Sequence, residues 1–506
     1  MALLQLPPEL LLRTSDHLTT SELGYLRLTC KAIESTLFDT FAKEFFTKRQ
    51  FMVEHVSLQA LLDIASHPTL SPWLTQIIIG ADMLPPFPDI AHLPSCARHR
   101  YLERRVFLST GLACEMLAEA LSKLPNLQTV GLRDYHGGPA GSGRERDGPD
   151  ASWKSYGWSC NLSEEQYQSR THLWRPSTTA WGHPGPLLPL ILQALGRAKA
   201  RPQNLEIFLR KGNKLDPWSF NVFNCRLAPS IPSILAGIQR LMLSISDLNR
   251  SSNNSGKDSI ETRMRSVPII KFLEHTPNLK CLRLNFHGDT SNADHILEWL
   301  GRRPEESSLE NSHMVAYVPP VQLDNLVELD LGMVSIHNYT LVDIVTKFSL
   351  KSLNLWKVSI KALKNPAGDG ISSLWPSFFT TVADKLISNT LQSVMVGWPA
   401  SREYEQDASP LDFKNMRFVI DGDHDNCKPE NVTHIVKYQA VFGSNIKDWL
   451  RETAAKFVTL EHVEPPFSGP IGNDSEDDEL EDELDESSEG TDDGEEIEEM
   501  SDEEDD

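Results

Sequence analysis

One short apolar pattern recurs along this chain and constrains its fold more than any other feature. An aliphatic residue is followed three positions later by an apolar residue, and two positions after that by a second. The seven clear copies are Leu74/Ile77/Ile79, Leu127/Val130/Leu132, Ile238/Leu241/Leu243, Leu279/Leu282/Leu284, Leu326/Leu329/Leu331, Leu350/Leu353/Leu355 and Leu391/Val394/Val396. Weaker copies are Phe413/Met416/Phe418 and Leu205/Phe208. The alternating pair that ends each copy predicts a short strand with both side chains on one face.

Apolar residues at helical spacing separate these copies. They occur over residues 112–124, 187–195, 267–273, 293–300, 341–348 and 378–386. Leucine-rich repeats have this succession of strand, loop, helix and strand. Each of their units buries its apolar face by stacking on the next. The steps between copies are irregular, so we expect an α/β fold with an irregular leucine-rich-repeat-like solenoid over residues 51–465. An ordinary α/β domain whose strands share the pattern is the alternative.

The residues that alternate with the buried pairs are expected to point away from the core. They form a mixed polar set: Arg133, Arg283, Asn285, Asp330, Asn354 and Trp356. Arginine and aromatic side chains carry much of the binding energy at protein interfaces, so this set is a candidate substrate-binding surface. The simpler alternative is a row of ordinary solvated side chains.

Residues 5–46 predict three short helices. Pro7, Pro8 and Glu9 suit a first helical turn, where a missing N–H is harmless and a carboxylate favours the helix dipole. Two apolar stripes follow at steps of three or four, formed by Leu23, Leu26, Cys30 and Ile33 and then by Leu37, Phe38, Phe41 and Phe45. A module this small buries little surface, so it is expected to lean on a partner or on a neighbouring domain.

The segment LPPELLLRTSDHLTTSELGYLRLTCKAI resembles an F-box. The shared features are Leu6-Pro7-x-Glu9-Leu10, Leu18, Glu22-Leu23 and Leu26-Arg27-Leu28-x-Cys30-Lys31, whereas Thr14, Thr29 and Ile33 depart from the family pattern. Residues 57–80 are similar to the continuation found in many F-box proteins of filamentous fungi. A plain helical cap on a larger fold is the alternative for residues 1–50.

The resemblance implies a substrate-recognition adaptor of a cullin-type (SCF) ubiquitin ligase. Residues 1–50 would bind a Skp-family linker, and the repeat body would bind a protein substrate. The expected linker contacts are Leu6, Pro7, Glu9, Leu10, Leu23, Leu26 and Cys30. Such an adaptor acts by proximity and needs neither a catalytic residue nor a cofactor of its own. The alternatives are a leucine-rich-repeat scaffold without a ligase role and an acidic-tail chaperone of basic proteins.

The acidity of the chain is concentrated at one end. The whole sequence has 48 Lys and Arg against 71 Asp and Glu, and residues 474–506 hold 22 of these acids and no Lys or Arg. The remainder is nearly neutral, which argues against nucleic-acid binding because such binding needs clustered cations. Residues 466–506 are therefore predicted to be a disordered acidic tail. Ser475, Ser487 and Ser501 precede acids and fit acid-directed kinases; a purely solubilising tail is the alternative.

Residues 134–186 interrupt the repeating pattern. The segment begins rich in Gly and Pro and continues with Trp153, Trp158, Trp174 and Trp181. Four tryptophans are costly to leave in water, so we expect the second half to fold back over the body as a lid. Binding of a partner is the alternative.

Motifs for catalysis and for metal binding are weak. Residues 421–432 imitate the start of a calcium loop but have Asn426 and Val432 where the loop needs Gly and Glu, and His424 with Cys427 would be half a metal site. No phosphate loop, GxSxG or HExxH occurs. The sequence predicts a non-enzymatic protein without a metal or membrane span, located in the cytoplasm, the nucleus or both, and not secreted.

Overall fold

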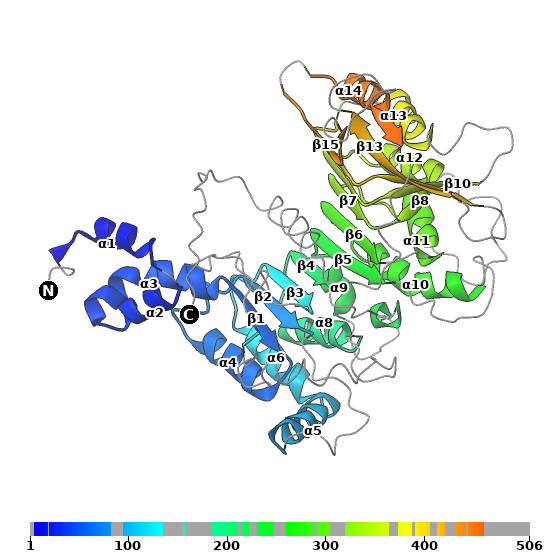
Figure 1. Ribbon diagram of the computed structural model, residues 1–506. Helices are drawn as coiled ribbons and strands as arrows, with labels where there is room; N and C mark the ends of the chain where they lie inside the picture. The colour runs from blue at the N-terminus through cyan, green and yellow to red at the C-terminus, as the bar shows by residue number, and fades with distance from the viewer. Residues whose placement is uncertain are drawn as a thin grey trace, which may run out of the picture.

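Two sheets and a row of helices make up the described part of the chain (Figure 1). The computed structural model describes residues 5–18, 20–81, 95–134, 155–156, 185–209, 215, 217–221, 230–246, 260–287, 291–303, 319–363, 373–386, 390–404, 412–419, 432–441 and 444–459. The fold is mixed α/β, as the sequence predicts, and its larger sheet is mostly parallel. None of the helices in these ranges is long and apolar enough to cross a bilayer.

The first sheet has ten strands that follow one another in chain order. They are β1 (Lys48–Met52), β2 (Gln76–Gly80), β3 (Thr129–Arg133), β4 (Asn204–Phe208), β5 (Arg240–Ser246), β6 (Cys281–His287), β7 (Glu328–Gly332), β9 (Ser352–Trp356), β11 (Ser393–Gly397) and β15 (Ile435–Gln439). All neighbours pair in parallel except β15, which is antiparallel to β11. Figure 1 shows the strands laid along an arc from β1 to β15.

The strand register places the repeated apolar pairs in two continuous rows. Leu282 is paired with Leu241 and Leu329, while Leu284 is paired with Leu243 and Leu331. These side chains are essentially inaccessible to solvent and belong to one continuous core. The predicted strands of all seven clear copies are therefore confirmed. The weak copy Leu205/Phe208 is wrong in its second member, because Ile207 fills the core row and Phe208 lies on the opposite face.

Helices cover the face of the first sheet that carries the apolar rows (Figure 1). They are α4 (His55–Ser66), α6 (Leu112–Ser122), α8 (Leu187–Ala198), α9 (Ile231–Leu235), α10 (Ile260–Glu274), α11 (Ser291–Gly301), α12 (Asn338–Lys347) and α13 (Leu374–Lys385). The six helices expected from apolar spacing are all present. A further helix, α5 (Ser95–Ser109), precedes α6, and a 3-10 turn, η4 (Pro217–Phe220), packs near α10.

A second sheet lies beside the C-terminal half of the first. Its strands are β8 (Ser335–His337), β10 (Ser359–Leu363), β12 (Ala400–Tyr404), β13 (Asp412–Val419), β14 (Val432–Thr433) and β16 (Phe457–Thr459). Strands β8, β10 and β12 are parallel, whereas β13 is antiparallel to β12, β14 and β16. The weak copy Phe413/Met416/Phe418 lies in β13, so it belongs to this sheet and not to the repeating one.

A left-handed corner joins the two sheets in three successive units. Met333, Lys357 and Trp398 each follow a strand of the first sheet directly and have φ values of 52°, 50° and 52°. The amides of Met333 and Lys357 donate to the carbonyls of Trp356 and Gly397, both at 2.8 Å. A positive φ is unfavourable for residues with a side chain, yet the hydrogen bonds between neighbouring corners hold it here.

At the Lys357 corner, glycine is expected to give a more stable protein than alanine, the reverse of the usual order. We expect the Lys357→Gly variant to unfold with a free energy about 1 kcal/mol higher than the Lys357→Ala variant, because only glycine adopts this φ without steric cost. Both variants lose the same side chain, so their difference isolates the backbone. Urea unfolding followed by circular dichroism measures it; equal stability, or the usual advantage of alanine, would contradict the left-handed corner.

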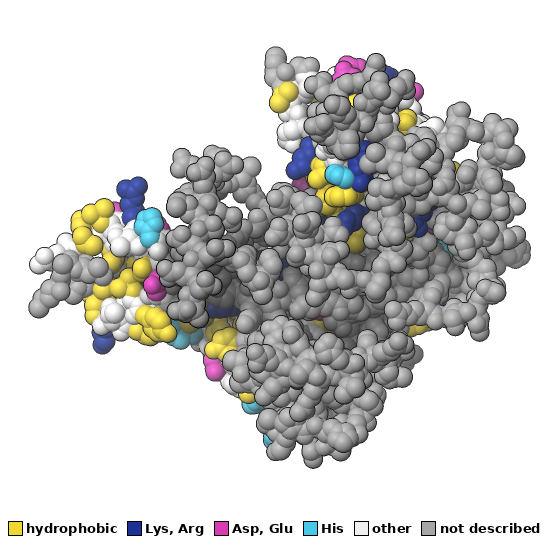
Figure 2. All heavy atoms as spheres, viewed as in Figure 1, with side chains coloured by type: hydrophobic (Ala, Val, Ile, Leu, Met, Phe, Trp, Pro, Cys, Tyr) yellow, Lys and Arg dark blue, Asp and Glu magenta, His cyan; other side chains and the backbone are white. Residues whose placement is uncertain are grey.

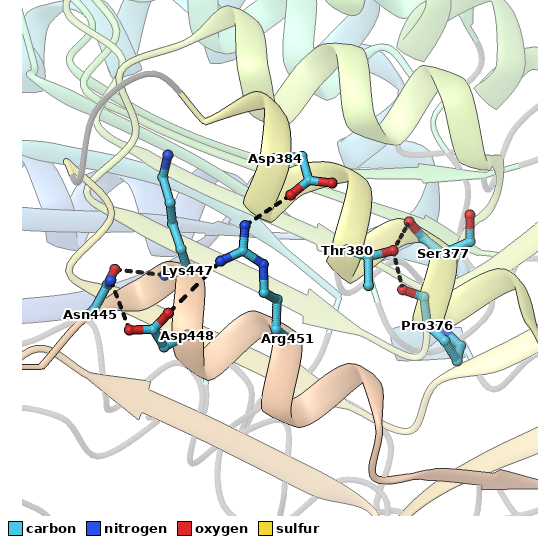
Figure 3. Close-up of polar contacts among 8 residues, drawn as sticks. All are labelled: Pro376, Ser377, Thr380, Asp384, Asn445, Lys447, Asp448 and Arg451. Carbon is cyan, nitrogen blue, oxygen red and sulfur yellow. Dashed lines mark hydrogen bonds and ion pairs between the residues drawn. The ribbon is translucent and has the colours of Figure 1, made fainter.

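The last helix fastens the end of the fold. Helix α14 (Ile446–Ala454) begins at Asn445, whose side chain accepts a hydrogen bond from the Lys447 amide. Figure 3 shows Arg451 of α14 reaching Asp384 of α13 at 2.9 Å and Asp448 at 3.9 Å. On α13, the Thr380 hydroxyl donates to the carbonyls of Pro376 and Ser377. The Arg451 pair is exposed and contributes little, so the buried Ile446 and Leu450 hold α14 in place.

Part of the 134–186 insertion contacts the first strand. The Tyr156 amide donates to the Gln50 carbonyl at 2.9 Å, and the Gln50 amide group donates to the Ser155 hydroxyl at 2.9 Å. Tyr156 forms an isolated parallel bridge with Phe51. These two residues add to the outer edge of β1. The four tryptophans of the predicted lid lie outside the described residues.

Candidate functional site

The N-terminal helices form a small module with a core of its own. They are α1 (Pro8–Ser15), α2 (Thr20–Arg27) and α3 (Lys31–Phe46). Their core consists of Leu11, Leu23, Ile33 and Leu37, and it is separate from the core of the sheets. The three expected helices are present, but the predicted stripe of Leu23, Leu26, Cys30 and Ile33 does not lie on one helix. Cys30 is the N-cap residue of α3, and Ile33 lies within α3.

Local chemistry explains where the first helix begins and ends. Pro7 is the N-cap residue and its carbonyl accepts hydrogen bonds from the amides of Leu10 and Leu11. Glu9 lies in the first turn, where its negative charge favours the helix dipole. Near the end, the Ser15 hydroxyl donates to the Leu12 carbonyl at 2.7 Å and is fully buried.

The module is attached to the first sheet through a short connection. Helix α3 ends at Phe46 and β1 begins at Lys48, so the strand crosses the expected boundary at residue 50. The guanidinium of Arg49 lies 5.5 Å and 5.7 Å from the ring centroids of Phe45 and Phe46. These cation–π contacts fix the end of α3 against β1.

The predicted linker contacts fall into two groups by exposure. Leu6, Pro7, Glu9 and Leu10 are exposed at the start of α1. Leu26 and Cys30 are half-buried against the module core, and Leu23 is completely buried within it. In this conformation the Leu23 side chain stabilises the packing of the three helices, and its predicted contact with a partner stays a prediction.

Two further apolar side chains of the module are open to solvent. Tyr25 is 72% exposed and Leu28 is 71% exposed, compared with 38% for Leu6 and 48% for Leu10. Figure 2 shows hydrophobic side chains gathered over the region of α1–α3. Exposure of Tyr25 and Leu28 could have been predicted, since both lie off the apolar stripe that runs through Leu23 and Leu26. These four side chains, which we call the module patch, form a candidate interface.

The face of the first sheet opposite the helices carries polar side chains in register. Glu206 of β4 accepts hydrogen bonds at 3.2 Å from Arg133 of β3 and from Gln76 of β2. The guanidiniums of Arg133 and Arg283 lie 5.4 Å and 5.7 Å from the Phe208 ring centroid. Further along, the Asn354 amide donates to the Asp330 carboxylate at 2.7 Å. We call this set the open-face ladder.

The six residues of the predicted substrate-binding surface lie on this open face but are largely buried, and their binding of a substrate stays a prediction. Arg133, Arg283, Asn285 and Trp356 are each less than a tenth exposed, and Asp330 and Asn354 are half-buried. The register explains part of this burial, because large side chains lie over neighbouring glycines. A Cβ on Gly332 would lie 2.2 Å from Asn285 Oδ1, and one on Gly397 would lie 2.3 Å from the Trp356 ring.

Burial also sets the protonation of two side chains on this face. It raises the pKa of the Asp330 carboxyl, against the lowering effects of Arg283 and of the Asn354 hydrogen bond. It raises the pKa of the Cys281 thiol as well, with Asp330 adding to the effect. Cys281 is therefore a neutral thiol at ordinary pH and a poor nucleophile.

The remaining candidate sites fall largely outside the described residues. The calcium-like segment 421–431, the His424 and Cys427 pair, and Ser475, Ser487 and Ser501 are not described. Within the described ranges, no three His, Cys, Asp or Glu side chains gather as metal ligands would. A scan against protein-family models finds no match to this chain, and a search of curated proteins finds none either.

Proposed function

We propose that this chain is a substrate-recognition adaptor of a cullin-type ubiquitin ligase. The module patch of Leu6, Leu10, Tyr25 and Leu28 would bind a Skp-family linker, with Pro7, Glu9, Leu26 and Cys30 beside it. The observation that carries the proposal is a three-helix module that has its own core and yet leaves these four apolar side chains in water. The F-box resemblance of residues 6–31 names the partner.

In the same proposal the body is an irregular leucine-rich-repeat-like solenoid that holds the substrate. Strands in chain order, parallel pairing and aligned apolar rows support this description. The open-face ladder is largely buried. Its residues therefore stabilise the packing of the body more than they contribute contacts to a substrate. The adaptor then acts by holding a substrate close to a ubiquitin-loaded enzyme, and the chemistry belongs to other subunits.

Substitutions in the module patch test the proposal. We expect the Leu6→Ala, Leu10→Ala double variant of the full chain to bind a purified Skp-family linker at least about 100-fold more weakly than the parent chain. Each truncated leucine is expected to lose about 1.5 kcal/mol of binding energy, and 1.4 kcal/mol corresponds to a factor of ten. Isothermal titration calorimetry measures the affinity.

A matched control is provided by Val56 on α4, which is 60% exposed and lies outside the module. Val56→Ala should leave linker binding unchanged, and all variants should melt within a few degrees of the parent because no buried contact is removed. Failure of the parent chain to bind the linker would reject the adaptor. Binding of the linker without assembly of a cullin would instead favour a repeat scaffold without a ligase role.

A further inference from the structure

Three segments that are distant in sequence meet near the end of the two sheets. Trp398 lies between β11 and β12, Arg417 lies in β13, and His434 lies between β14 and β15. The Trp398 amide donates to the His434 carbonyl at 2.8 Å, and the Met416 amide donates to the Pro399 carbonyl at 2.9 Å. Main-chain hydrogen bonds therefore hold the three segments together.

The Trp398 side chain contacts both of the others. The ring centroids of Trp398 and His434 are 3.9 Å apart with an angle of 23° between the planes. The guanidinium carbon of Arg417 is 5.0 Å from the Trp398 ring centroid. Arg417 is only 4% exposed, and Trp398 and His434 are half-buried. We call this group the Trp–His–Arg cluster.

Polar atoms of this cluster are buried without a hydrogen-bond partner. They are Trp398 Nε1, His434 Nδ1 and Arg417 Nε. Arg417 Nη1 donates to its neighbour's carbonyl, that of Met416, at 3.0 Å, and no ion pair joins Arg417 to a carboxylate of the described residues. A buried guanidinium without an anion is unfavourable. Binding of a negatively charged group at the cluster would therefore be stabilising.

The pKa shifts of Arg417 and His434 indicate the same uncompensated positive charge. Burial lowers the pKa of the Arg417 guanidinium, and burial together with the Arg417 charge lowers the pKa of the His434 ring. Lys357 occupies the corner next to Trp398 in the row of left-handed corners, where its amide donates to the Gly397 carbonyl.

The chain itself carries acidic residues close to this cluster along the sequence. Strand β16 pairs with β13, and Val458 is the register partner of Arg417. The described chain ends one residue later, at Thr459. The 14 residues between Thr459 and Asp474 can span at most about 50 Å when extended, so the 22 acids of residues 474–506 begin within reach of the cluster.

We propose that Trp398, Arg417 and His434 form an acceptor site for carboxylates of residues 474–506 of the same chain. Arg417 pairs with a carboxylate, and the indole Nε1–H donates a second hydrogen bond. The segment then blocks the site against acidic peptides from other molecules. This inference is independent of the proposed linker binding, because the module patch adjoins β1 at the opposite end of the first sheet.

The test uses two full-length chains and one labelled peptide. In the first chain the tail is unchanged; in the second, the amide-tail chain, each of the 22 acids of residues 474–506 is replaced by its amide. The probe is a fluorescein-labelled peptide with the sequence of residues 474–489, followed by fluorescence anisotropy. A tethered segment acts at an effective concentration in the millimolar range, so we expect the amide-tail chain to bind the peptide at least about 10-fold more tightly than the parent.

Variants of the amide-tail chain test whether the peptide binds at the Trp–His–Arg cluster. Arg417→Gln should weaken peptide binding at least about 10-fold, the loss of one charge-assisted pair. Arg451→Gln is the matched control and should change nothing, because this arginine lies on the exposed surface of α14 and is already paired with Asp384. Trp398→Gly is a second variant: it removes the indole but relieves the positive φ, so folding is retained while binding falls.

Each remaining outcome overturns the proposal. Absence of peptide binding by the amide-tail chain rejects the acceptor site. Equal loss with Arg417→Gln and Arg451→Gln shows diffuse attraction between charges. Equal binding by the parent and the amide-tail chain shows that the tail does not occupy the site. Thermal melting of every variant checks folding; if Arg417→Gln fails to fold, unchanged binding by Trp398→Gly still rejects the site.

Discussion

Replacing Trp375 with alanine is expected to lower the free energy of unfolding by about 3–5 kcal/mol, the range for removal of a buried aromatic side chain. Trp375 is completely buried on α13. Its ring stacks on Phe457 of β16 with centroids 5.8 Å apart, and its Nε1–H donates to the Ala400 carbonyl of β12 at 2.7 Å. The side chain thus joins α13 to the second sheet, and its loss leaves both a cavity and an unpaired carbonyl.

A conservative substitution separates these two contributions. Trp375→Phe keeps most of the ring packing but removes the donor to Ala400, so we expect a smaller loss of about 1–3 kcal/mol. Urea unfolding followed by circular dichroism measures both variants. If Trp375→Ala lost less than about 1 kcal/mol, packing of the second sheet on α13 through this residue would be refuted.

The second large effect is expected at the buried ion pair of the open-face ladder. Glu206→Ala should lower the free energy of unfolding by about 3–5 kcal/mol, because it removes the carboxylate from a buried arginine. The Arg133 Nη2 to Glu206 Oε2 distance is 3.2 Å, and each side chain is 9% exposed. Gln76 loses its acceptor at the same time.

Replacing both members of the pair tests this explanation. The Arg133→Met, Glu206→Leu chain should be far more stable than the Glu206→Ala chain, because no charge remains buried without its partner. The exposed pair of Arg451 and Asp384 is the matched control, and Arg451→Ala should change stability by less than about 1 kcal/mol. Equal effects at the two pairs would mean that the open-face ladder is solvated.

Much of the first sheet could be predicted from the sequence, because its strands are buried and repeat one pattern. The alternation of apolar Leu282 and Leu284 with polar residues is enough to predict strand β6. Strand β1 is not evident from the sequence, because Lys48, Arg49 and Gln50 are polar, although Phe51 lies in the same core row as Ile79. The second sheet is not evident from the sequence, because β8 and β10 are short and each begins two residues after a corner residue that is not glycine.

The candidate sites were harder to predict, since burial depends on partners from other strands. The sequence placed Arg133 on the open face, but its carboxylate partner Glu206 lies 73 positions away. The Trp–His–Arg cluster has no local signature, because its members come from three segments and meet only through main-chain pairing. The exposure of Leu10 could not be predicted from apolar spacing, because Leu10 neighbours the buried Leu11 in the same apolar run.

The two ends of the ten-stranded sheet bear on self-association. A parallel sheet that grows in chain order could, in principle, recruit another copy at either edge, as happens in fibrils. At one end β1 carries Lys48 and Arg49 and is bridged by Tyr156. At the other, the direction reverses at β15, which bears the exposed Lys437. Charge and reversal together disfavour edge-to-edge growth, so the architecture limits its own aggregation.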